Sequence, residues 1–102
     1  MSRLVAPALL ALLVLTGCTS HTTSCSGGTC TVGLSGEQTV EIEIGRVERD
    51  LRVAPIEADA VTVSVRGDAA RLRVGESAPV GGLLVRVDAI SGQDVDLQVQ
   101  QA

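Results

Sequence analysis

The sequence predicts an all-β fold, a small antiparallel sandwich or barrel of six or seven short strands. Apolar residues recur at every second position in several short blocks, which is the periodicity of half-buried strands. Turn sequences rich in Gly, Ser and Asp separate the blocks at intervals of about 8 to 12 residues, as in sandwiches and small barrels. No long segment shows helical periodicity. With 102 residues, the chain is at most one small domain.

The clearest strands are four blocks in which aliphatic residues alternate with polar ones, so their aliphatic side chains are expected to face the core. These core-facing residues are Val40, Ile42 and Ile44; Val61, Val63 and Val65; Leu72 and Val74; and Val95, Leu97 and Val99. The full set of strands is expected at about residues 30–34, 39–44, 47–54, 60–66, 69–74, 83–90 and 94–100. Pro55 and Pro79 are expected at strand ends or in loops, where a missing N–H group is tolerated.

Two of these strands are less regular than the others. In residues 47–53, Arg49 falls on the apolar face, so we expect a bulge or a shortened strand. In residues 83–90, one face is apolar up to Ala89, but Leu84 and Ile90 fall on the opposite face. This strand is therefore expected to be covered on both sides.

The first seventeen residues have the order of regions that a secretory signal peptide has. One positive charge, Arg3, precedes an apolar run from Leu4 to Leu15, and small residues follow before Cys18. As a helix, such a run of about twelve residues spans roughly 18 Å, well short of the ~30 Å hydrocarbon core of a membrane. We therefore interpret residues 1–17 as a removed export signal and not as a transmembrane helix.

The end of this segment, Leu15-Thr16-Gly17-Cys18, resembles the lipobox of bacterial lipoproteins. The resemblance implies that Cys18 carries diacylglycerol and becomes the first residue of the mature chain. It also implies an anchor on the extracytoplasmic face of the cell membrane, since two acyl chains give stable attachment. An ordinary signal peptide cleaved near the same place is the alternative. The segments 25–32, 75–78 and 80–83 are similar to small, uncharacterised actinobacterial lipoproteins, which implies a location and no activity.

Once Cys18 is lipidated, Cys25 and Cys30 remain as an even pair in an oxidising compartment, so a disulfide is expected. The glycines between them allow the tight reversal that such a small ring needs. Two alternatives are a redox-active pair and a metal site in which His21 joins the two cysteines. The chain is thus divided into a signal peptide (1–17), a lipidated cysteine with a flexible tether (18–24) and a β-domain (25–102).

The composition excludes several classes of function. All eight basic residues are arginine, so no lysine is present for a Schiff base, a P-loop or a Ser-Lys pair. The absence of aromatic residues and the net charge of −4 argue against nucleic acid as a partner. His21 is the only histidine, and it precedes the expected domain, so the candidate nucleophiles have no base beside them. Those candidates are Ser26, Ser35, Ser64, Ser77 and Ser91.

Acidic residues occur at alternate positions in three places, so each pair is expected to share one face of a strand. The pairs are Glu41 with Glu43, Glu48 with Asp50, and Asp94 with Asp96. One interpretation is a calcium ion held by oxygens from neighbouring strands. The other, which we favour, is a solvated face whose carboxylates pair across the sheet with Arg71, Arg73 or Arg86.

These observations together predict a membrane-anchored extracytoplasmic lipoprotein that acts as a non-catalytic interaction or structural β-module. Its expected partners are the membrane, through Cys18, and an envelope protein. We expect no catalytic residues, no cofactor and no metal site. A lipoprotein that binds a solute or a metal ion is the alternative.

Overall fold

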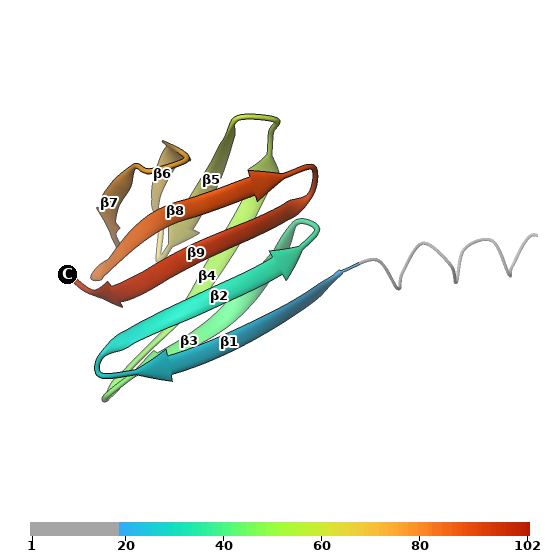
Figure 1. Cartoon of the computed structure of the whole chain (residues 1–102). Helices are drawn as coiled ribbons and strands as arrows, with labels where there is room; N and C mark the ends of the chain where they lie inside the picture. The colour runs from blue at the N-terminus through green and yellow to red at the C-terminus, as the bar shows by residue number, and fades with distance from the viewer. Residues whose placement is uncertain (1–18) are drawn as a thin grey trace, which may run out of the picture.

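The computed structural model describes residues 19–102, which form nine strands in two antiparallel sheets (Figure 1). One sheet has five strands in the order β1-β2-β9-β8-β7, and the other has four in the order β3-β4-β5-β6. The strands are β1 (Ser20–Ser26), β2 (Thr29–Ser35), β3 (Gln38–Ile44), β4 (Val47–Ile56), β5 (Ala60–Val65), β6 (Asp68–Arg73), β7 (Ser77–Val80), β8 (Leu83–Ser91) and β9 (Asp94–Gln101). The predicted all-β fold is confirmed, as two open sheets typical of a sandwich, with more strands than the six or seven expected.

The core lies between the two sheets and is built from aliphatic side chains together with Cys30. Alternation along the strands places it there, because every second side chain of a strand points to the same face. Most of the predicted core residues are buried, whereas Val74 lies just beyond the end of β6 and is half exposed. Within residues 19–102 the structure buries no polar or charged side chain.

Two strands, β1 and β7, were not predicted from the sequence. The flexible tether expected at residues 18–24 is wrong from Ser20 onward, because β1 pairs with β2 along its whole length. All side chains of β1 are exposed, so no apolar alternation marks it. β7 has four residues, of which only Val80 is fully buried, and it contains Pro79. The proline is tolerated inside this strand because β7 is an edge strand.

The irregularities in β4 and β8 lie elsewhere than expected. Arg49 causes no bulge, and β4 pairs with β3 without interruption from Val47 to Val53. The register of β4 shifts only towards its end, between Val53 and Ile56, and Pro55 lies in that stretch. A second shift between Val87 and Ala89 turns Ala89 outward and packs Ile90 against the core. β8 is therefore not covered on both sides.

The two ends of the sandwich differ. Figure 1 shows that β1 begins at one end, beside the β2–β3 and β8–β9 turns, and that the C-terminus lies at the other. We call the end where β1 begins the proximal end. The second, the distal end, carries the hairpin turns Gly27-Gly28, Gly45-Arg46, Arg66-Gly67 and Gly81-Gly82.

Candidate functional site

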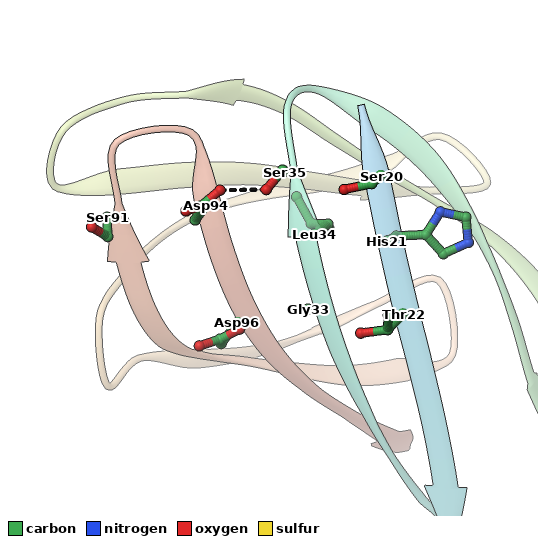
Figure 2. Close-up of a pocket in the computed structure, with 9 residues that line it drawn as sticks. All are labelled: Ser20, His21, Thr22, Gly33, Leu34, Ser35, Ser91, Asp94 and Asp96. Carbon is green, nitrogen blue, oxygen red and sulfur yellow. Dashed lines mark hydrogen bonds between the residues drawn. The ribbon is translucent and has the colours of Figure 1, made fainter. Parts of the chain in front are cut away.

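A shallow hollow of about 470 Å³ lies on the outer face of the five-stranded sheet at the proximal end. Register explains its composition, because Ser20, Ser35, Asp94 and Ser91 are paired in one row across four strands. Residues in one row point to the same face of a sheet. The row therefore gathers three hydroxyl groups and one carboxylate, and Figure 2 shows these side chains around the hollow.

Gly33 forms the floor of the hollow. Its partners are Thr22 on β1 and Asp96 on β9. A Cβ atom at Gly33 would lie 3.3 Å from Asp96 Oδ1 and 3.5 Å from Thr22 Oγ1. The missing side chain thus leaves the Thr22 hydroxyl and the Asp96 carboxylate open to solvent on either side. No role for this glycine could be predicted from the sequence, because the requirement for it comes from neighbours on two other strands.

The predicted pair Asp94 and Asp96 shares this face, as the spacing indicated. Ser35 Oγ donates a hydrogen bond to one oxygen of Asp94, which Figure 2 marks with a dashed line. The hollow therefore presents hydroxyl groups and two carboxylates, a surface that suits a polar or positively charged group. Within residues 19–102 no group of three or more His, Cys, Asp and Glu side chains is arranged to hold a metal ion.

His21 borders the hollow but does not complete a catalytic arrangement with Ser35 and Asp94. Its ring points away from both side chains in Figure 2. The ring Nδ1 lies 3.1 Å from Gln38 Oε1, so it donates to that amide oxygen. Gln38 Nε2 in turn donates to the carbonyl oxygens of Ser20 at 2.8 Å and Ser35 at 2.9 Å. The histidine thus helps to hold the start of β1 against the start of β3.

Cys25 and Cys30 form the predicted disulfide. They are directly opposite each other in the β1–β2 pair, and the Gly27-Gly28 turn closes the hairpin just beyond them. Each sulfur lies 3.9 Å from the carbonyl oxygen of Glu43, a packing contact because a disulfide sulfur has no hydrogen to donate. His21 is four residues away along β1, about 13 Å. The structure therefore does not bring the three predicted metal ligands together.

The other acidic pairs lie on the β3–β4 hairpin, where Glu41 is directly opposite Asp50 and Glu43 is opposite Glu48. Their predicted pairing with arginines is wrong. Arg71 instead pairs with Glu57 at 2.9 Å on the β4–β5 connection, and Arg86 pairs with Asp88 at 3.3 Å on its own strand. The register sets like charges opposite each other, which is unfavourable for a strand pair.

The ion pair with Glu57 affects the titration of Arg71. Its hydrogen bond to Glu57, followed by the charge of that carboxylate, raises the pKa of Arg71 above its ordinary value. The guanidinium is exposed, so the pair is a surface contact of small energetic value.

Searches against protein-family models, curated proteins and solved structures find no match. In the described part of the chain, no helix has the length and apolar character needed to cross a membrane. The predicted signal peptide, residues 1–17, and the predicted lipidation site, Cys18, lie outside the described residues.

Proposed function

We propose that the protein is a lipoprotein anchored to the extracytoplasmic face of a bacterial membrane, where it serves as a rigid, non-catalytic interaction module. The supporting observation is where β1 begins. Only Thr19 separates Cys18 from Ser20, the first residue of a strand that is paired along its whole length. A lipid on Cys18 would therefore hold a folded sandwich close to the membrane surface, with no flexible spacer between them.

The contacts that hold both ends of β1 support the same proposal. Gln38 and His21 hold the beginning of the strand, and the disulfide holds its end. An anchor attached to such a strand transmits its position to the whole five-stranded sheet. The distal turns would then point away from the membrane, about 23 Å along β1 from the anchor, where an envelope protein can reach them.

Membrane fractionation of Cys18→Ala tests the anchor. The variant should leave the membrane fraction, and the membrane form of the wild type should have the mass of residues 18–102 plus a diacylglycerol. Cys25→Ser is the matched control, since it also replaces one cysteine but should remain membrane-bound. Retention of Cys18→Ala at the wild-type level would overturn the anchor.

In-cell photocrosslinking tests the interaction role. A crosslinking residue at Arg46, in a distal turn, should capture one defined envelope protein. The same residue at Ser91, near the proximal end, serves as the matched comparison. If both positions capture the same scattered set of neighbours, the interaction module is rejected.

Ion binding is the second candidate function, and the hollow around Gly33 is the observation that favours it. Asp94 and Asp96 lie there among hydroxyl oxygens, which are the ligands that calcium prefers. Calcium should then raise the melting temperature in a concentration-dependent way, and Asp96→Asn should abolish the rise. A flat response up to millimolar calcium would eliminate this candidate.

A further inference from the structure

A second hollow, of about 390 Å³, lies at the distal end where the β7–β8 turn of one sheet meets the other sheet. Its lining residues are Arg49, Arg66, Asp68, Gly81 and Gly82. The turn is fixed from both sides. Arg49 Nε donates to Gly81 O at 3.1 Å, and Gly81 N donates to Asp68 Oδ2 at 3.1 Å. The walls of this hollow are therefore held by contacts between the two sheets.

Arg49 is oriented in advance of any ligand. Besides its bond to Gly81 O, its Nη1 donates to Glu48 O at 2.8 Å. These two contacts use part of the five N–H donors of a guanidinium and fix its plane. The Nη2 group lies 3.7 Å from the position that a Cβ on Gly82 would take, so it borders the space above the turn. A guanidinium held in this way loses little freedom when it binds an oxyanion.

Arg66 occupies a backbone position that glycine fills in the comparable turns. Each of the five two-residue hairpin turns has a first residue with φ between 52° and 62°. That residue is Gly27, Gly45, Gly81 or Gly92 in four turns and Arg66 in the fifth. Among the described residues Arg66 is the only non-glycine with positive φ, a conformation that costs about 1 kcal/mol. A side chain kept at such a position points to a role for its charge.

The side chains that line this hollow carry more positive than negative charge. The two guanidiniums outnumber the single carboxylate of Asp68, one oxygen of which already accepts a hydrogen bond from Gly81. Unlike Arg71 and Arg86, neither arginine of the hollow takes part in an ion pair in residues 19–102. The backbone N–H of Ala102 donates to Gly82 O at 3.1 Å on the other side of the turn.

We propose that Arg49, Arg66 and the Gly81-Gly82 turn form a binding site for a single oxyanion group, a carboxylate or a phosphate. Guanidinium groups bind both through paired, charge-assisted hydrogen bonds. The inference rests on the proposed function, since it assigns the partner an anionic group and places the contact at the distal end. On a chain of net charge −4, this hollow is lined by two arginines and a single aspartate, a local balance of charge that favours an anionic group.

The test is a titration of the ¹⁵N-labelled, membrane-extracted protein in detergent micelles. Inorganic phosphate and acetate are added separately, with sodium chloride at matched ionic strength as the reference. The Gly81 and Gly82 amides and Arg49 Nε–H should shift saturably at millimolar phosphate, acetate or both. Saturation by phosphate alone identifies a phosphoryl group, and saturation by acetate alone identifies a carboxylate.

Arg66→Gly is the decisive variant, because glycine fits the positive φ and leaves the turn intact. It should fold like the wild type and bind about tenfold more weakly. Arg46→Gly, in the neighbouring distal turn but outside the hollow, should leave binding unchanged. Equal shifts with chloride, no saturation, or unchanged binding by Arg66→Gly would each overturn the site. Failure of the photocrosslinking test with this titration intact would instead overturn the interaction role alone.

Discussion

Gly81 lies where the β7–β8 turn passes over the end of β5. A Cβ atom there would come within 2.5 Å of Val65 Cγ1 and 2.7 Å of the Val65 carbonyl oxygen. The residue also has a φ of 55°. We expect Gly81→Ala to lower the free energy of unfolding by about 2 to 4 kcal/mol, since both backbone strain and overpacking oppose it.

Gly45→Ala is the matched control for this prediction. Gly45 has a similar φ of 61°, but an added Cβ would meet nothing within 4 Å. Its cost should stay near 1 kcal/mol. Urea unfolding followed by far-UV circular dichroism measures both, because the chain has no aromatic residue to report by fluorescence. Equal losses for the two variants would show that the approach to Val65 is not a tight one.

At the scale of the element, β1 depends on the disulfide more than on its own side chains. Cys25 is exposed, whereas Cys30 is fully buried in the core. Loss of the small ring should cost about 2 kcal/mol in either single variant. Cys30→Ser should cost about 1 to 3 kcal/mol more than Cys25→Ser, because it also buries a hydroxyl group. Thermal unfolding of the two variants in reducing buffer measures the difference, and equal melting temperatures would contradict the burial of Cys30.

The β3–β4 hairpin is strained electrostatically by its register. Glu43 and Glu48 are directly opposite, so Glu48→Arg should replace a repulsion with an attraction. We expect an increase of about 0.5 to 1 kcal/mol in the free energy of unfolding at low ionic strength. Glu48→Gln, which only removes the repulsion, should give a smaller increase. Both gains should shrink in 1 M salt, and a gain that is independent of salt would require another cause.

Periodicity predicted the strands that carry the core but could not predict those that do not. Val40 to Ile44 and Val61 to Val65 alternate because one of their faces is buried. β1 is held by backbone pairing, a disulfide and Gln38, none of which leaves a pattern in its own residues. The bulge after Val87 changes which face Ala89 and Ile90 occupy, and no local signal marks it.

The residues of the candidate sites, like the strands, could be predicted from the sequence only in part. Asp94 and Asp96 could be predicted to share a face, because they are two residues apart on one strand. The hollow at Gly33 and the contact between Arg49 and Gly81 could not be predicted, since each is formed by strands that are distant in the sequence. The partner of Arg71 was missed because Glu57 lies in the β4–β5 connection, which only the fold brings beside β6, whereas Arg86 pairs with Asp88 two residues along its own strand.

At the scale of the whole molecule, the short connection to β1 makes the proposed orientation measurable. With lipidated protein in nanodiscs containing a gadolinium-labelled lipid, amides near the headgroups relax fastest. We expect strong broadening at the proximal turns, Gly36-Glu37 and Gly92-Gln93, and weak broadening at the distal turns. The broadening should differ because β1 alone separates the two ends of the sandwich by about 23 Å.

An insertion of ten Gly and Ser residues between Thr19 and Ser20 is the matched control. It leaves the lipid and the sandwich intact but replaces the short connection with a flexible coil of roughly 16 to 19 Å root-mean-square length. The broadening should then become weaker and similar at both ends, because the domain can tumble against its anchor. Equal broadening at both ends of the wild type would mean that β1 does not fix the orientation, even though the anchor is present. A gradient that survives the insertion would assign the orientation to contacts between the sandwich and the lipid surface.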